Sequence, residues 1–381
     1  MRVRAVFSTA SCALLALLAL ASGARAQTTY VAFGDSITEG ALDDPNRVEK
    51  GYPPRLEALL QQRGQAAEVR NEGLGGETTS DGLSRIDKVL KAGDDVLLLM
   101  EGTNDIGEQD VSNETIAVNL DKIAEKAEDR GLTVVHATIL PRFNSNYDGT
   151  NIVTGAFNGL VRELAWQDER KLADPFEVFY HLTPNFGRLY SDKLHPNAAG
   201  YDLLARVFAD VLTNVDNVPP VTGLVLPVAD SPRVSPTAPL HLNVYDFGAG
   251  IDVTATRLVI NGQVLDTPLT GSSRKLEITY NPPTPWKGVV VVQLRSRDLA
   301  SPPNVLDREI TFFTIEGTTF LPGDIDRDGR VDGADLLAFA PHFGARRGEA
   351  RFAGVADLNA DSEVNGADLA VLASNFGKSS F

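Results

Sequence analysis

Three side chains that lie far apart in the chain have the chemical types that nucleophilic catalysis requires: Ser36, Asp192 and His195. A serine hydroxyl is a poor nucleophile at neutral pH, so it needs an imidazole to accept its proton and a carboxylate to hold that imidazole in one tautomer. Asp192 and His195 stand close enough in the chain for one turn to present both. We therefore predict that Ser36 is the nucleophile, His195 the general base and Asp192 its orienting group.

The segments around these residues predict a parallel α/β sheet. Short apolar runs alternate with amphipathic stretches between residues 27 and 215, as in βαβ units. We expect strands at 28–34, 67–72, 94–101 and 132–139, and helices at 52–63, 79–91, 113–130, 154–170 and 197–212. Pro196 suits the first position of the last helix. Because ligands bind at the carboxyl ends of strands in open α/β sheets, we expect Ser36, Gly76 and Asn104 to converge there.

Some of these polar residues also admit a structural interpretation. A lone Gly-Asp-Ser is typical of a turn, and Asp192 could cap the helix after Pro196. Asp35 and Asp105 are interpreted as structural.

The remaining histidines are weaker candidates for the base. His136 falls in an expected buried strand and is interpreted as a core residue. His181 could line a substrate cleft, whereas His241 and His342 belong to later regions of the chain.

Four sequence blocks in a fixed order carry a family resemblance. They are Gly34-Asp35-Ser36-Ile37-Thr38, Asn71-Glu72-Gly73-Leu74-Gly75-Gly76-Glu77-Thr78, Gly102-Thr103-Asn104-Asp105 and Asp192-x-x-His195. Together they resemble the four blocks of the SGNH (GDSL) hydrolases over residues 28–212. The resemblance implies a flavodoxin-like three-layer α/β fold with a parallel sheet, and ester hydrolysis through an acyl-serine intermediate without a catalytic cofactor. It also implies an oxyanion hole formed by the backbone N–H groups of Ser36 and Gly76 and the side-chain amide of Asn104. The Gly-x-Ser-x-Gly elbow does not occur around Ser36, which argues against the α/β-hydrolase fold.

The first residues have the pattern of a secretory signal peptide. Arg2 and Arg4 precede an apolar run from Cys12 to Ala21, and Ala24-Arg25-Ala26 has the small residues of a cleavage site. The run is too short to span a membrane stably. We therefore expect residues 1–26 to be removed, the protein to be secreted to the periplasm or the medium, and no membrane span to be present.

Composition restricts the possible partners. The formal net charge is −16, and loss of the signal peptide would remove three arginines and no acid. Such a charge disfavours nucleic acid and anionic membranes as partners. Cys12 is the only cysteine, so the mature protein is expected to contain no disulfide.

The middle of the chain predicts a β-sandwich at residues 216–318, after an α/β domain at 27–215. Val218-Pro219-Pro220 marks a linker, and the apolar runs 240–244, 255–260, 276–280 and 289–294 are short and separated by turns. The region resembles immunoglobulin-like or fibronectin-like modules. We interpret it as a spacer, with polysaccharide binding as the alternative.

The last region, residues 319–381, contains an internal repeat, because 324–344 recur as 357–377. Oxygen-bearing side chains occupy positions one, three, five and twelve of each copy, the spacing of a calcium loop. They are Asp324, Asp326, Asp328 and Asp335 in the first copy, and Asp357, Asn359, Asp361 and Asp368 in the second. The backbone carbonyls of Arg330 and Glu363 and water-mediated contacts from Asp332 and Asn365 would complete two Ca²⁺ sites. The apolar stretches 336–343 and 369–376 are expected helices.

Two such loops, each followed by one helix, resemble a dockerin type I module. The resemblance implies calcium-dependent folding and, in some systems, docking to a cohesin scaffold. Two positions depart from the pattern: Ser362 replaces glycine in the second loop, and Gly333-Ala334 and Gly366-Ala367 stand where dockerins carry partner-contacting residues.

These observations predict a secreted serine esterase that removes short acyl groups, such as acetyl, from a carbohydrate polymer or a small ester. The expected cleft walls, residues 41–51, 141–152 and 175–191, are more polar than apolar, which favours small or polar substrates. One alternative is a lysophospholipase or thioesterase-like lipid hydrolase. Another is an adhesion or scaffold protein that carries an inactive hydrolase domain.

Overall fold

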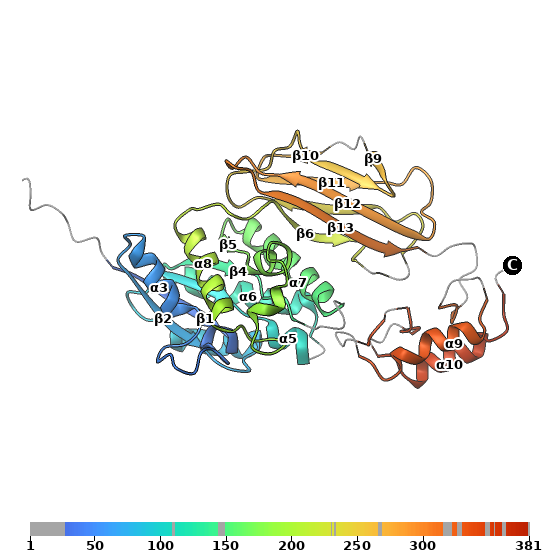
Figure 1. The fold of residues 1–381 in the computed structure, drawn as a ribbon, viewed down its shortest axis with the longest axis horizontal. Helices are drawn as coiled ribbons and strands as arrows, with labels where there is room; N and C mark the ends of the chain where they lie inside the picture. Colours follow the sequence, from blue (N-terminus) through green and yellow to red (C-terminus); the bar gives the residue numbers. More distant parts are fainter. Residues whose placement is uncertain are drawn as a thin grey trace, which may run out of the picture.

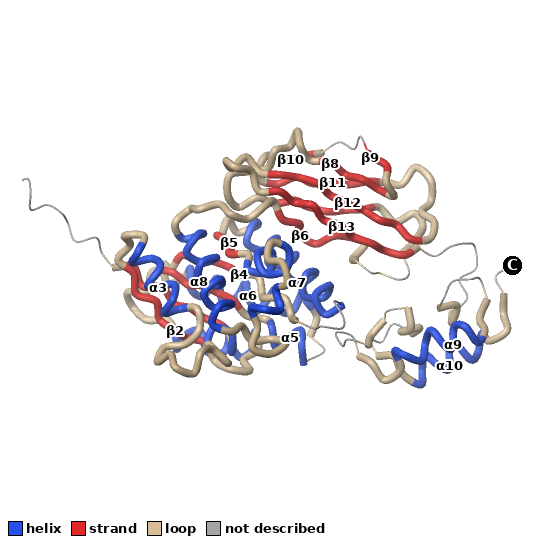
Figure 2. Tube along the Cα trace, viewed as in Figure 1, coloured by secondary structure: helices blue, strands red, loops and turns tan. Residues whose placement is uncertain are grey.

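The computed structural model describes residues 27–381 except 109–110, 144–148, 230, 232–233, 266–268, 315–321, 326–329, 347–350, 354, 360–362 and 380–381. The expected signal peptide lies outside the described residues. A parallel α/β part, two antiparallel sheets and a pair of C-terminal helices follow one another along the chain (Figures 1 and 2). Within these described ranges, no helix is long and apolar enough to cross a membrane.

The first sheet contains five parallel strands in the order β2-β1-β3-β4-β5. They are β1 (Thr28–Gly34), β2 (Ala67–Gly73), β3 (Val96–Met100), β4 (Thr133–Ala137) and β5 (Lys171–Ala173). This is the flavodoxin-like order, in which ligands bind where the order reverses, between β1 and β3. The predicted parallel α/β architecture is confirmed, and Ser36 follows β1 at this position.

Helices cover both faces of the parallel sheet. They are α2 (Ser36–Glu39), α3 (Pro53–Gln62), α4 (Thr79–Val89), α5 (Thr103–Glu108), α6 (Asn113–Glu128), α7 (Gly149–Gln167) and α8 (Ala198–Leu212). Helices α3 and α8 contact each other on one face, and α4, α6 and α7 form the other layer. Helix α7 begins at Gly149, earlier than the expected residue 154, so it takes up the end of the predicted loop 141–152.

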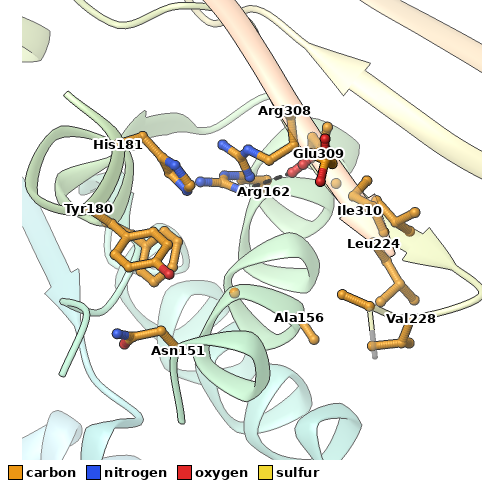
Figure 3. Close-up of a pocket in the computed structure, with 16 residues that line it drawn as sticks. Asn151, Ala156, Arg162, Tyr180, His181, Leu224, Val228, Arg308, Glu309 and Ile310 are labelled. Carbon is orange, nitrogen blue, oxygen red and sulfur yellow. Dashed lines mark hydrogen bonds between the residues drawn. The ribbon is translucent and has the colours of Figure 1, made fainter. Parts of the chain in front are cut away.

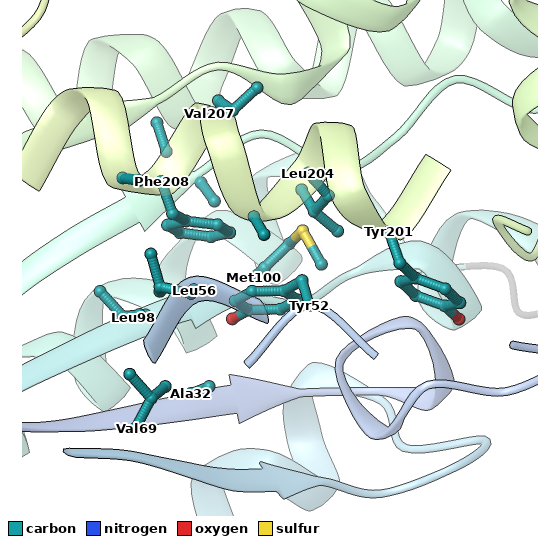
Figure 4. Packing of buried hydrophobic residues seen from close by; sticks show 14 of the residues in the cluster. Ala32, Tyr52, Leu56, Val69, Leu98, Met100, Tyr201, Leu204, Val207 and Phe208 are labelled. Carbon is teal, nitrogen blue, oxygen red and sulfur yellow. The ribbon is translucent and has the colours of Figure 1, made fainter. Parts of the chain in front are cut away.

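Large side chains from α3 and α8 fill the space above the sheet (Figure 4). The ring of Tyr52, directly before α3, stacks on Phe208 of α8 with their centroids 4.7 Å apart. Leu56 and Leu204 are fully buried beside them. Burying a side chain of this size typically contributes about 1.5–3 kcal/mol to stability, so these side chains stabilise the packing of α3 and α8 on the sheet.

The middle part consists of two antiparallel sheets that share one apolar core. One sheet contains β6 (Val221–Leu226), β7 (Leu240–Tyr245), β10 (Thr270–Gly271) and β11 (Lys275–Tyr280); the other contains β8 (Arg257–Ile260), β9 (Gln263–Leu265), β12 (Val289–Arg297) and β13 (Val305–Phe313). Side chains of both sheets pack around Trp286, whose indole N–H donates to the carbonyl of Ala238 at 2.8 Å. All four predicted apolar runs lie in or overlap these strands.

The C-terminal part repeats one local structure twice. Helix α9 (Gly333–Phe339), continued by a short 3₁₀ turn, and helix α10 (Gly366–Asn375) each begin with a capping box. Val331 and Val364, at equivalent positions before the two helices, are fully buried in a core that also contains Leu372. The predicted helices are therefore present, but both begin earlier than expected and the first ends in the 3₁₀ turn.

Candidate active site

Ser36 is the first residue of α2, directly after the carboxyl end of β1. Asp35 caps this helix, because one of its carboxylate oxygens accepts the N–H of Ile37 at 2.8 Å. Gly34 permits the close packing that this turn needs, since a Cβ atom there would lie 2.1 Å from the carbonyl oxygen of Met100. The turn thus presents the Ser36 hydroxyl at the edge of the sheet, and Asp35 has the structural role that was predicted.

His195 and Asp192 reach the same edge from the loop before α8. The hydroxyl oxygen of Ser36 lies 2.9 Å from Nε2 of His195, and Nδ1 of His195 lies 2.9 Å from Oδ2 of Asp192. The other oxygen of Asp192 accepts the backbone N–H groups of Leu194 and His195 at 2.7 and 2.6 Å. Asp192 is therefore occupied by its own loop and by the imidazole, and the alternative that it caps α8 does not apply: Asn197 is the cap.

The pKa of Asp192 is lowered. Partial burial by itself raises the pKa of this carboxyl, but the hydrogen bonds from the ring of His195 and from the N–H groups of His195 and Leu194 outweigh that effect. The carboxylate is consequently ionised at neutral pH. An ionised acceptor at Nδ1 places the imidazole proton on that nitrogen and leaves Nε2 as an acceptor toward Ser36.

The loop that carries His195 is tied to neighbouring segments. The N–H of Phe143 donates to the carbonyl of Lys193 at 2.8 Å, and the hydroxyl of Ser191 donates to the carbonyl of Leu42 at 2.9 Å. Pro196 pairs with Tyr190 and precedes the cap residue, so it stands outside α8 rather than at its first position. The first two contacts join the loop of His195 to the expected cleft walls 141–152 and 41–51.

Gly76 lies in the turn that follows β2, and Asn104 is the second residue of α5, the helix that follows β3. Gly76 has φ +78°, which favours glycine. Within the described residues, the N–H groups of Ser36 and Gly76 donate to no protein acceptor. The amide of Asn104 donates one hydrogen to the carbonyl of Glu77 at 2.7 Å and keeps its second hydrogen. These groups therefore have the donors that an oxyanion hole needs.

An ion pair that the sequence did not reveal fixes the Gly76 turn. Arg85 of α4 forms a two-point pair with the buried carboxylate of Glu77, with Nε 2.7 Å from Oε1 and Nη2 in contact with Oε2. Arg85 also donates to the carbonyl of Glu72 at 3.0 Å and lies over the ring of Phe33. Arg85 thus binds Glu72 before Gly76 and Glu77 after it, and so restrains the backbone of the Gly76 turn.

Buried carboxyl groups lie beneath the catalytic candidates. Asp105 accepts the N–H and hydroxyl of Thr79 at 3.0 and 2.7 Å, in keeping with its predicted structural role. Burial raises the pKa of Asp35 to about 6. Burial also raises the pKa of Glu101 well above its usual range, and the neighbouring Glu77, Asp35 and Asp105 add to that effect. These effects all favour the protonated form of Glu101.

The other histidines lie away from Ser36. His136 is fully buried in β4, where burial and the nearby Arg170 lower its pKa to about 3. His241 contacts the hydroxyl of Thr279, and His342 contacts the carbonyl of Arg351. None of these contacts reaches the serine.

His181 lines a cavity of about 250 Å³ between the first two parts of the molecule (Figure 3). The cavity is bounded by α7, the turn Glu177–His181 and strands β6 and β13, and Arg162 and Arg308 enter its lining. Ser36, Asp192 and His195 are not among the residues around it. His181 therefore borders this cavity and makes no contact with the catalytic candidates among the described residues.

The two calcium-loop candidates close in the same way. Buried Asp335 accepts the N–H of Asp332 at 2.8 Å, and buried Asp368 accepts that of Asn365 at 2.8 Å. The side chains of Asp332 and Asn365 cap α9 and α10. Predicted ligands Asp326, Asp328 and Asp361 lie outside the described residues, whereas Asp324, Arg330, Asp357, Asn359 and Glu363 are described. The donors are all oxygen atoms, the ligands that Ca²⁺ prefers, so the residues present fit that ion.

Comparisons with known proteins match two regions of the chain. Residues 32–203 match the model of the GDSL-like lipase/acylhydrolase family, and residues 322–376 match the dockerin type I domain. An arylesterase of Vibrio mimicus is 28% identical over 203 residues, which cover 52% of this chain and 95% of that protein.

Two solved structures illustrate the similarity. A lipase/acylhydrolase from Enterococcus faecalis is 22% identical with a TM-score of 0.41, covering 48% of this chain and 93% of its own. An acetylxylan esterase from Geobacillus stearothermophilus is 21% identical with a TM-score of 0.44, covering 49% and 94%. The two family models and the arylesterase identify residues 32–203 as a GDSL-like lipase/acylhydrolase domain and residues 322–376 as a dockerin type I domain, so the protein is a carboxylic ester hydrolase.

Proposed function

We propose that the protein is a secreted serine esterase that acts through an acyl-serine intermediate. The observation that carries this proposal is the chain of contacts from the Ser36 hydroxyl to His195 and from His195 to Asp192, each 2.9 Å long. In this arrangement Nε2 accepts the serine proton as Oγ attacks the ester carbonyl, and the ionised Asp192 stabilises the imidazolium that forms.

The proposed oxyanion donors act at the same step. As Oγ of Ser36 bonds to the carbonyl carbon, negative charge develops on the carbonyl oxygen, and the N–H groups of Ser36 and Gly76 and the free amide hydrogen of Asn104 stabilise it. His195 then gives its proton to the leaving alcohol, which leaves Ser36 acylated. Water, deprotonated by His195, attacks the acyl group and releases the acid, which restores the serine.

We propose that the acyl group is short, such as acetyl, and that its alcohol is a carbohydrate or another small polar molecule. The walls nearest Ser36 support this: the segment 41–51 contains three acidic residues and two basic ones, and a Cβ atom placed on Gly75 would lie 3.9 Å from that of Ser36. A crowded, polar entrance favours small or hydrated substrates over a long acyl chain.

The ends of the chain supply the rest of the proposal. Residues 1–26 act as a secretory signal, and the dockerin domain binds two Ca²⁺ ions through its repeated loops. Dockerin domains bind cohesins, so a cohesin-bearing scaffold is the proposed partner. The surface that would face the cohesin includes the first turns of α9 and α10. These turns carry only small exposed residues, Gly333, Ala334, Gly366 and Ala367. Larger exposed side chains nearby, such as Leu337, would therefore make the contacts with the cohesin.

The test compares the purified protein with Ser36→Ala on p-nitrophenyl esters of increasing acyl length and on acetylated xylan. We expect turnover that depends on Ser36 and is highest for acetyl. A preference for long acyl chains would support the lysophospholipase or thioesterase-like alternative. Activity that is absent in the wild type, or equal in Ser36→Ala, would overturn the proposal and leave a binding protein on a hydrolase scaffold.

A further inference from the structure

Three carboxylates meet where the segment after α8 reaches the antiparallel sheets. Asp216 belongs to that segment, Asp246 directly follows β7 and Asp298 directly follows β12. One oxygen from each lies within 4.8 Å of the others. Asp246 and Asp298 are each only 2% exposed. Three negative groups from separate parts of the chain are thus gathered in a largely buried place.

Backbone N–H groups hold each carboxylate in position. Oδ1 of Asp246 accepts the N–H groups of Gly248 and Gly250 at 2.9 and 2.7 Å. Oδ1 of Asp298 accepts that of Asn304 at 2.8 Å, and Oδ2 of Asp216 accepts that of Ala249 at 2.7 Å. The turns after β7 and β12 are therefore folded around these side chains, which orients them without neutralising them.

The cluster has hydrogen-bond donors but, in the described part of the chain, no positively charged partner; the side-chain amide of Asn304 also donates to Oδ2 of Asp298 at 2.6 Å. Oδ2 of Asp246 is buried and has no hydrogen-bond partner. Among the described residues, no lysine, arginine or histidine forms an ion pair with Asp216, Asp246 or Asp298. Burial raises the pKa of Asp246 to about 6, and Asp216 and Asp298 add to this. A buried, unpaired carboxylate is costly, so a proton or a cation must balance it.

We propose that Asp216, Asp246 and Asp298 bind a divalent cation, with Ca²⁺ as the natural ion. The donors are carboxylate oxygens, which hard cations prefer. Two oxygens that bind one Ca²⁺ at about 2.3–2.6 Å each can lie up to about 5 Å apart, which accommodates the spacing of these side chains. The unpartnered Oδ2 of Asp246 supplies the most buried ligand, and water completes the coordination through the half-exposed side at Asp216.

The cation would lock the junction between the hydrolase domain and the antiparallel sheets. Asp216 lies a few residues after α8, whereas Asp246 and Asp298 lie in two turns of the neighbouring sheets. A single ion bound to all three would tie both turns to the segment that leaves the hydrolase domain. The site lies outside residues 322–376, so it is distinct from the calcium loops of the dockerin domain.

Aromatic residues near the cluster make the site separately observable. Tyr245 precedes Asp246, and Trp166 of α7 lies 5.4 Å from the ring of Tyr245 and 6.4 Å from that of Phe247. Residues 322–376 contain neither tryptophan nor tyrosine. Terbium, which replaces calcium at oxygen sites and emits when a neighbouring tryptophan is excited, therefore reports on the junction and not on the dockerin loops.

The experiment titrates terbium into the full chain under tryptophan excitation. We expect saturable emission that is displaced by Ca²⁺ and that, in the double variant Asp335→Asn, Asp368→Asn, remains and saturates at one equivalent. Asp246→Asn, whose amide oxygen can still accept from Gly248 and Gly250, should raise the dissociation constant at least tenfold. The matched control Asp307→Asn removes an exposed charge from β13 and should titrate like the wild type.

Circular dichroism of each variant establishes that it is folded. If Asp246→Asn does not fold, Asp216→Asn gives the same comparison, because Asp216 lies outside the strands. Absence of sensitised emission in the wild type, or equal affinities for the Asp246→Asn or Asp216→Asn variant and the Asp307→Asn control, would overturn the proposal. Neither result depends on ester hydrolysis.

Discussion

Replacing Asn104 by alanine tests the proposed oxyanion hole at its side-chain donor. One amide hydrogen of Asn104 is used by the carbonyl of Glu77 at 2.7 Å, so only the other is free for substrate. Loss of one such donor typically lowers kcat by about 10²–10³-fold, equivalent to about 2.7–4 kcal/mol of transition-state stabilisation. Because the donor acts on charge that develops during the reaction, we expect kcat to fall by this factor while KM changes little.

The same substitution also removes the hydrogen bond to Glu77. A hydrogen bond of this kind contributes about 1 kcal/mol to stability, so the unfolding temperature should fall by only a few degrees. Steady-state kinetics on p-nitrophenyl acetate, measured beside thermal unfolding, separate the two effects. Asn119→Ala is the matched control, since Asn119 is likewise half-buried and donates one hydrogen bond, to Thr79 at 3.1 Å, on helix α6.

The expected pattern is a large loss of kcat in Asn104→Ala and none in Asn119→Ala. A folded Asn104→Ala enzyme with kcat within about threefold of the wild type would refute the oxyanion role, because a donor that matters in the transition state is worth far more than that. A change confined to KM would instead assign Asn104 to uniform substrate binding.

Three further results are expected. Asp192→Asn should lower kcat by about 10²–10⁴-fold with little change in KM, because the imidazole loses the acceptor that sets its tautomer; steady-state kinetics check this, and an unchanged kcat would exclude Asp192. Asp35→Asn should be more stable than the wild type at high pH. The pKa of Asp35 is raised from 3.8 to about 6 in the native state. The proton on Asp35 therefore stabilises the native state fully at a pH below 3.8, and this contribution is lost as the pH rises through 6. The variant has no such proton to lose. Its free energy of unfolding in urea should therefore rise relative to that of the wild type by up to about 3 kcal/mol between pH 4 and pH 8, and a difference that does not change with pH would contradict the assignment. Chelation of Ca²⁺ should lower the unfolding temperature of α9 and α10 while ester hydrolysis survives; calorimetry beside an activity assay checks this, and parallel loss of both would show that the hydrolase domain itself depends on bound Ca²⁺.

Sequence patterns predicted the parts of the fold that rest on periodicity. The strands and helices from Thr28 to Leu212 are long enough for their apolar residues to mark one face, so the parallel α/β architecture could be predicted. Strand β5 was not predicted because its three residues are too short to show a period. Strands β6 and β13 were also missed, the first because it directly follows the Pro219-Pro220 linker.

The site was predicted as residue types but not as a network. Motif order identified Ser36, Asp192 and His195 without any knowledge of the loops that join them. The pair between Arg85 and Glu77 could not be predicted, because it depends on how the turn at Gly76 places Glu77 under α4. Asp332 and Asn365 could be recognised as oxygen donors, but their use as helix caps depends on where each helix begins.

The seam between the hydrolase domain and the antiparallel sheets limits how the chain can be cut. Arg162 of α7 is 1% exposed, pairs with Asp174 at 2.7 Å and donates across the seam to the carbonyl of Thr222 at 2.9 Å. A truncation after residue 215 would strip that carbonyl from a buried guanidinium and uncover the face of α7 that packs on β6. A protein made of residues 27–215 alone would therefore expose this face of α7 to solvent, and we expect it to aggregate. The hydrolase domain should be produced or fused to other proteins together with the antiparallel sheets.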